Sequence, residues 1–89
     1  MASVSDFEQG QSFSVEAGGQ TIALEVSAVK PIANSPRDGG GFTLLFRGPR
    51  EMALPQAIYR LVQGDVAHEI FIVPVAADAA GYVYEAVFN

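Results

Sequence analysis

The sequence contains no cysteine, no tryptophan and a single histidine, His68. Without cysteine, neither a disulfide nor a thiolate metal site can stabilise the fold, and one histidine excludes a site built from several histidines. A chain of 89 residues buries only about 60–65% of the surface that its unfolded form exposes, so its core is small. Oligomerisation is the remaining common way for such a domain to bury more apolar surface.

Basic residues are also scarce. Ten carboxylates outnumber five cations, giving a formal net charge of −5, and the cations are Lys30, Arg37, Arg47, Arg50 and Arg60. Nucleic-acid binding needs a dense basic face, so we expect no nucleic-acid partner. Apolar residues make up 49% of the chain and charged residues only 17%. The charged fraction is low for a small soluble domain, and it predicts a partner that covers apolar surface.

Targeting segments are not evident in the sequence. The start, "MASVSDFEQGQSF", has neither the basic region nor the apolar stretch of a secretory signal. No apolar run approaches the roughly 20 residues that span a bilayer. We therefore expect a single domain over residues 1–89, made in the cytoplasm and not inserted into a membrane. Whether it then becomes part of an extracellular structure or a particle stays open.

Alternating apolar and polar residues predict strands along most of the chain. Gly18 and Gly19 separate two such runs, which is typical of a two-residue hairpin turn. The short connections predict an all-β fold, a small antiparallel barrel or sandwich of about six to seven strands arranged mostly as a meander. Pro31 and Pro74 should mark strand ends, bulges or edges, because proline cannot donate to a ladder. The predicted strands lie near residues 12–16, 22–28, 42–47, 56–62, 69–75 and 82–88.

The segment 53–62, "ALPQAIYRLV", is ambiguous between strand and helix. Leu54, Ile58 and Leu61 fit helical spacing, and Pro55 is compatible with a first helical turn. The β-branched and aromatic residues favour a strand. We predict a strand, with a helix as the alternative.

Catalytic chemistry is not indicated by any motif. His68 would need a nucleophile, but the chain has no Gly-x-Ser-x-Gly element, and every serine lies in its first 35 residues. Asp38, Asp65 and Asp78 each lie near a glycine in a turn signal, where aspartate caps the backbone. We therefore predict no catalytic residue, no metal site and no cofactor, and hence a protein that is not an enzyme.

Four polar or aromatic side chains are candidates for binding an anion or a carbohydrate: Arg47, Arg50, Gln56 and Tyr59. Both arginines follow a glycine-rich loop, but pairing with Glu51 or with a neighbouring subunit accounts for them more simply. Gln56 has a simpler role too, since its amide can satisfy a backbone group beside Pro55. A ligand-binding module is thus the alternative to a structural module.

Three elements stand out in the second half of the chain: Pro-Gln-x-x-Tyr-x-Leu (Pro55, Gln56, Tyr59, Leu61), Phe-x-Val-Pro-Val (Phe71, Val73, Pro74, Val75) and the closing "YEAVFN" at 84–89. With these elements the chain resembles a small bacterial domain family of unknown function, with members of about ninety residues. The front half, including "FEQGQSFSV" and "GFTLLFRGP", fits as well. This chain has Ala57-Ile58 where the family usually has Gly-Thr, which makes that segment more apolar. The resemblance implies a compact β domain encoded near phage-tail-collar-like proteins, and it brings no catalytic residues.

The last two predicted strands carry large apolar groups on both faces, although one face is enough to line a core. Exposed apolar patches usually mark interaction surfaces. We expect a non-enzymatic structural module that forms homo-oligomers through apolar strand faces or through edge pairing of the C-terminal strand, in a phage-tail-like, filamentous or surface assembly. The alternative cover for the second face is the N-terminal segment, folded back through Phe7. The candidate interface residues are Phe71, Val73, Val75, Tyr82, Val83, Tyr84, Val87 and Phe88.

Overall fold

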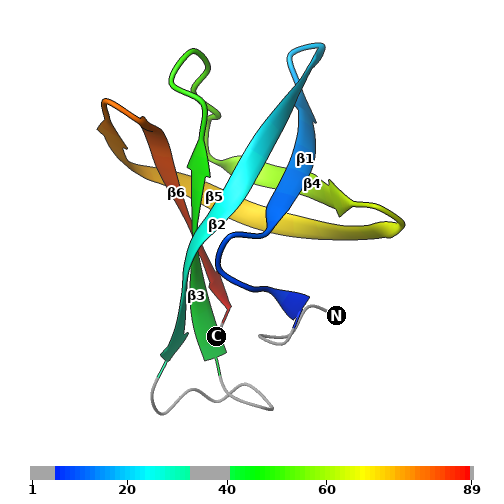
Figure 1. The fold of residues 1–89 in the computed structure, drawn as a ribbon, viewed down its shortest axis with the longest axis vertical. Helices are drawn as coiled ribbons and strands as arrows, with labels where there is room; N and C mark the ends of the chain where they lie inside the picture. Colours follow the sequence, from blue (N-terminus) through cyan, green and yellow to red (C-terminus); the bar gives the residue numbers. More distant parts are fainter. Residues whose placement is uncertain (1–5, 33–40, 89) are drawn as a thin grey trace.

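The computed structural model describes residues 6–32 and 41–88, which form a single closed antiparallel barrel (Figure 1). The all-β antiparallel prediction is confirmed. Asp38 and most of the glycine-rich loop lie outside the described residues, as does Asn89. The strands are β1 (Ser12–Ala17), β2 (Gln20–Ile32), β3 (Gly41–Gly48), β4 (Ala57–Gln63), β5 (Val66–Asp78) and β6 (Gly81–Phe88).

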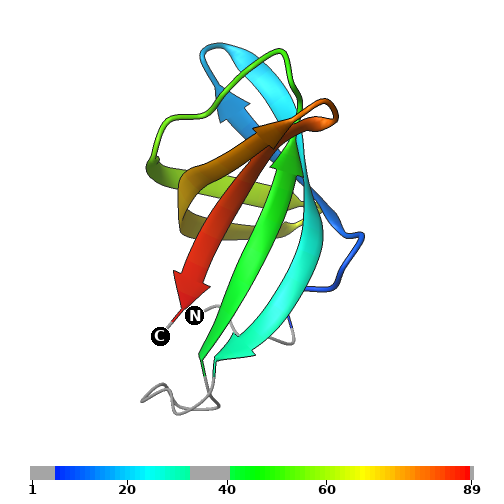
Figure 2. The same cartoon turned by 90° about the vertical axis from the view of Figure 1, so that its left-hand side faces the viewer.

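The barrel consists of two meanders joined edge to edge in the order β1-β2-β3-β6-β5-β4. Strand β3 pairs with β6 from Phe42–Phe88 to Gly48–Tyr82, which makes one long junction. The other junction, between β1 and β4, has a single partner pair, Ser14 with Val62. Figure 2 shows β2, β3 and β6 side by side along the long axis. Strand β6 is therefore paired on both sides, with β3 and β5, so the expected open edge at the C-terminal strand is wrong.

The glycine turn and the proline positions agree with the prediction, although β2 and β5 extend beyond their predicted ends, to Ile32 and to Asp78. Gly18 and Gly19 join β1 to β2 with φ values of 58° and 79°, a left-handed pair that glycine adopts without strain. Pro74 lies at a register shift between Pro74 and Ala76, a β-bulge in the pairing of β5 with β6. The ambiguous segment is strand from Ala57 onward and irregular over 53–56.

The barrel interior is filled by apolar side chains from all six strands, together with two from outside them. Leu54, in the connection from β3 to β4, is buried, and its N–H donates to the Tyr84 hydroxyl at 2.8 Å. Phe7, from the N-terminal segment, is also buried. The core consists of Phe7, Phe13, Val15, Ile22, Leu24, Val26, Phe42, Leu44, Phe46, Leu54, Leu61, Ile70, Ile72, Tyr84 and Ala86.

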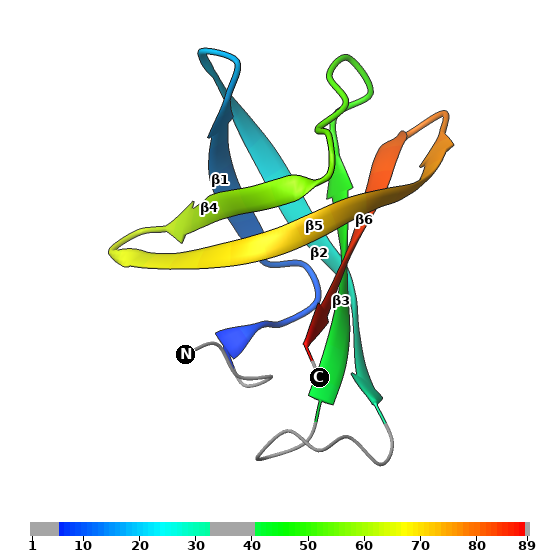
Figure 3. The same cartoon turned by 180° about the vertical axis from the view of Figure 1, so that it is seen from behind.

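The N-terminal segment and the β3–β4 connection lie at opposite ends of the barrel (Figure 1 and, from behind, Figure 3). The Phe7 ring centre lies 5.9 Å from that of Phe13, 6.0 Å from Phe42 and 6.1 Å from Phe88. The N-terminal segment does fold back through Phe7, but onto the core, so the prediction that it covers the second face of the last two strands is wrong. Because its partners point inward, Phe7 closes the barrel interior and leaves the outer strand faces uncovered.

Candidate functional site

The predicted interface residues divide between the inside and the outside of the barrel. Tyr84 is fully buried in the core, so its assignment to an interface is wrong. Tyr82 and Phe88 are half-buried and pack against the core, and the Phe88 ring stacks on Phe42 with centroids 4.5 Å apart. Tyr82, Tyr84 and Phe88 lie on the same face of β6, and closure of the barrel turns that face toward the core.

The other predicted residues lie on the outside, where they form what we call the outer apolar face. Phe71, Val75 and Val87 are 49%, 50% and 51% exposed, respectively. Sequence reasoning missed Ile58, which at 67% is the most exposed large apolar residue among the described residues and lies on β4 directly opposite Phe71. In a strand, Ile58 and Leu61 must lie on opposite faces, so one of these two large apolar side chains had to be exposed. The sequence could have shown this, but a helix over 53–62 had stayed an alternative. The outer apolar face comprises Ile58, Phe71, Val73, Val75, Val83 and Val87.

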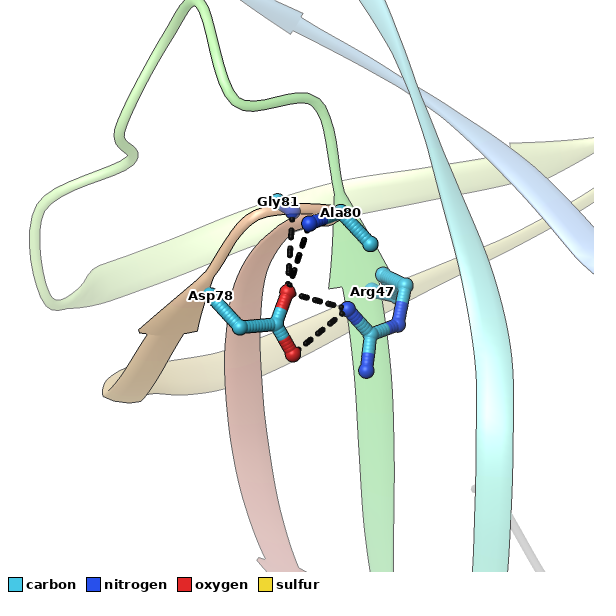
Figure 4. A network of polar contacts seen from close by, with 4 residues as sticks. All are labelled: Arg47, Asp78, Ala80 and Gly81. Atoms are coloured by element: carbon cyan, nitrogen blue, oxygen red, sulfur yellow. Dashed lines mark hydrogen bonds and ion pairs between the residues drawn. The ribbon is translucent and has the colours of Figure 1, made fainter.

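Arg47 is engaged within the chain, since its guanidinium binds Asp78 (Figure 4). Arg47 Nη1 lies 2.8 Å from Asp78 Oδ1 and 3.1 Å from Oδ2. Asp78 Oδ1 also accepts from the N–H groups of Ala80 at 2.9 Å and Gly81 at 3.1 Å. The predicted pairing of Arg47 with Glu51 is therefore wrong, its pairing with another subunit stays a prediction, and the predicted turn-capping role of Asp78 is confirmed. The hydrogen bond from Arg47, followed by that from Ala80, lowers the pKa of Asp78 below its ordinary value of 3.8.

We expect the Arg47–Asp78 pair to add acid sensitivity to folding. A carboxylate with a lowered folded-state pKa contributes stability above its unfolded pKa and loses it as the pH falls through the folded value. Asp78→Asn should therefore be less stable than the wild type near neutral pH. It should also lose less stability between about pH 4 and pH 2. Thermal unfolding at both ends of this range measures the difference, and equal losses in the two proteins would contradict the role of the pair.

The remaining ligand candidates do not converge on one site. The Tyr59 hydroxyl donates to the Pro55 carbonyl at 2.7 Å, and burial followed by the nearby Tyr84 raises the pKa of Tyr59. Tyr59, and not Gln56, thus satisfies the backbone beside Pro55, which corrects the role predicted for the glutamine. Gln56 and Arg50 are exposed.

A surface groove lies on the outside of the β1–β4 junction. It has a volume of about 440 Å³ and is lined by Ser14, Glu16, Thr21, Arg60 and Val62. A second hollow of about 340 Å³ lies beside the β1–β2 turn and is lined by residues 16–21. Neither is lined by the arginines, glutamine or tyrosine predicted as ligand residues.

Titratable groups are dispersed over the described part of the chain. His68 packs on Phe7 and Phe13, with ring centres 5.1 Å and 6.2 Å apart. Within residues 6–32 and 41–88, no polar or charged residue is buried, and no three His, Asp or Glu side chains are grouped to hold a metal ion. The same residues include no helix with the length and apolarity needed to cross a bilayer.

These features define a small closed β-barrel with an apolar outer face and a single weakly paired junction. The chain belongs to the family described as "Domain of unknown function (DUF6916)", whose model matches residues 2–88. The match covers nearly the whole chain and agrees with the resemblance to a small domain family of unknown function. Comparisons with curated proteins and with solved structures found no match.

Proposed function

We propose that this protein is a non-enzymatic structural module that self-associates through its outer apolar face. The observation that carries the proposal is the exposure of large apolar side chains on neighbouring strands of a closed barrel. Ile58 and Phe71 are direct cross-strand neighbours, and both are about half exposed or more. Contiguous exposed apolar surface of this kind is characteristic of interaction sites. Packing it against another copy would remove it from water.

The positions of the charged residues indicate which part of the outer apolar face can be buried in a contact at least cost. Glu85 lies between Val73 on β5 and Leu45 on β3 in the cross-strand register. Burying a carboxylate without a partner is costly, so a subunit contact centred on Glu85 is disfavoured. Ile58 lies on β4, one strand further from Glu85 than Phe71 and Val73, and Glu69, on the same face, lies directly opposite Arg60. We therefore place the centre of the contact at the Ile58–Phe71 pair.

The wider setting that we propose is a bacterial phage-tail-like, filamentous or surface assembly. Its support is the sequence resemblance to domains encoded near phage-tail-collar-like proteins. A small β-barrel that packs against copies of itself suits a repeated structural part. The same reasoning supports a second copy, or a structural protein of the same assembly, as the partner.

The test is the mass of the protein in solution across micromolar concentrations, by light scattering or sedimentation. We expect the wild type to show a concentration-dependent oligomer. Phe71→Asp should weaken association by about 10- to 100-fold, because it places a charge at the centre of an apolar contact. The control is Ala23→Asp, which adds the same charge at an exposed position of β2 outside the outer apolar face, and we expect this variant to associate as the wild type does. A wild type that stays monomeric throughout would refute self-association.

A ligand-binding module remains the alternative proposal, for a carbohydrate or an anion. It has less support, because the Arg47 guanidinium is bound to Asp78, and the Tyr59 hydroxyl is bound to Pro55. Chemical-shift changes of Arg50 and Gln56 on titration with phosphate or a simple sugar would favour it over self-association.

A further inference from the structure

The β1–β4 junction leaves part of the barrel open to pairing. Ser14 pairs with Val62, so continued antiparallel register would next place Glu16 opposite Arg60. That pair does not form, and both residues instead line the groove of about 440 Å³. Figure 3 shows β1 crossing β4 at a steep angle. The strands therefore separate beyond Val62 along the first half of β4.

The hairpin turns determine which backbone groups face this opening. The two-residue turn after Gln63 makes Gln63 and Val66 a hydrogen-bonded pair of the β4–β5 ladder. Hydrogen-bonded residues alternate along an antiparallel strand, so Tyr59 and Leu61 bond to β5. The N–H and C=O groups of Ile58 and Arg60 then point away from β5, toward the open junction. These residues form a short free strand edge in an otherwise closed barrel.

The side chains at this edge are compatible with a second copy of the same strand. Ile58, the most exposed large apolar residue of the described chain, lies on it and touches the centre of the outer apolar face. Arg60 and Glu16 line the same groove but form no ion pair with each other. A surface carrying one cation and one anion is self-complementary across a two-fold axis.

We infer that two copies of the chain pair through β4, antiparallel and about a two-fold axis at Tyr59. Ile58 of each copy then lies opposite Arg60 of the other, and each edge supplies the donors and acceptors that the other lacks. The two β4–β5–β6 sheets become continuous, which brings the two Ile58–Phe71 pairs together on one surface. Arg60 of each copy also reaches the groove that carries Glu16 of the other. This inference rests on the proposed self-association, and it adds a second contact, along the free edge of β4, to the contact between outer apolar faces.

Amide hydrogen exchange measured by NMR at low and high protein concentration tests the pairing. The amides of Ile58 and Arg60 should exchange rapidly in the monomer and slow by about tenfold or more on association. The amides of Tyr59 and Leu61, bonded to β5, should be protected at both concentrations and serve as internal controls. If the protein associates while the Ile58 and Arg60 amides stay unprotected, the β4 pairing is overturned and self-association stands. If the wild type never associates, both proposals fail.

Arg60→Pro provides an independent test of backbone pairing. Proline is tolerated where the N–H faces away from the ladder, so the barrel should still fold, as judged by circular dichroism. The substitution removes one hydrogen-bond donor per copy. Association should weaken by about tenfold or more relative to Arg60→Ala, which removes the same side chain and keeps the N–H. Equal association of the two variants would refute pairing through β4, and if Arg60→Pro does not fold, the exchange measurement on the wild type decides.

Discussion

Gly81→Ala is expected to destabilise the domain by about 3–5 kcal/mol, because the added methyl group meets both an unfavourable backbone conformation and a close backbone contact. Gly81 opens β6 with φ at 143°, a conformation that residues with a side chain rarely adopt. A Cβ at this position would also overlap the carbonyl oxygen of Gly48 on β3. Backbone atoms cannot rotate away as a flexible side chain can, so relief requires the β3–β6 junction to separate locally.

Urea unfolding followed by circular dichroism measures this cost against the wild type. Gly64→Ala is the matched control, because Gly64 also has a positive φ, of 59°, but an added Cβ would meet nothing within 4 Å. Gly64→Ala should lose only the free energy of unfolding that a positive φ costs a residue with a side chain, about 1 kcal/mol. Similar losses for the two variants would show that the β3–β6 junction yields at Gly81 and that the close approach to Gly48 is not a constraint.

Phe7→Ala should cost about 3 kcal/mol, an unusually large loss for a residue so near a chain end. Phe7 is 4% exposed and contacts rings from β1, β3, β5 and β6. Its segment is held to β2 by hydrogen bonds from the Gly10 N–H to the Val26 carbonyl and from the Val26 N–H to the Gln11 carbonyl, both 2.8 Å long. Removing the ring opens one end of the barrel and leaves a cavity beside Phe13 and Phe42.

The unfolding free energy of Phe7→Ala should be compared with that of Phe71→Ala. Phe71 is half exposed on the outside of β5, so its truncation should cost the monomer less than about 1 kcal/mol. Measurement at a low protein concentration keeps association from contributing to either value. If Phe7→Ala is no more costly than Phe71→Ala, then the N-terminal segment is not part of the cooperative core.

Local rules were sufficient where neighbouring residues decide the structure. The Gly18-Gly19 turn, the capping role of Asp78 and the bulge beside Pro74 were all predictable, because each depends on the backbone preferences of a few consecutive residues. Arg47 was assigned the wrong partner because its carboxylate, Asp78, lies 31 positions away along the chain. The two residues meet only because β3 and β6 pair, and no local pattern specifies that pairing.

The sequence by itself determined an all-β chain, its strand positions and the excess of apolar groups in its C-terminal hairpin. It could not assign the two faces of β6, because alternation separates the Tyr84 face from the Val83 face without indicating which is buried when both are apolar. Closure of the ring decided this by placing Tyr84 inside, where its hydroxyl accepts from Leu54. Closure also left β1 and β4 with a single pair, and so produced the free edge beside Ile58. Both outcomes depend on pairing between strands far apart in the chain, which only the tertiary structure determines.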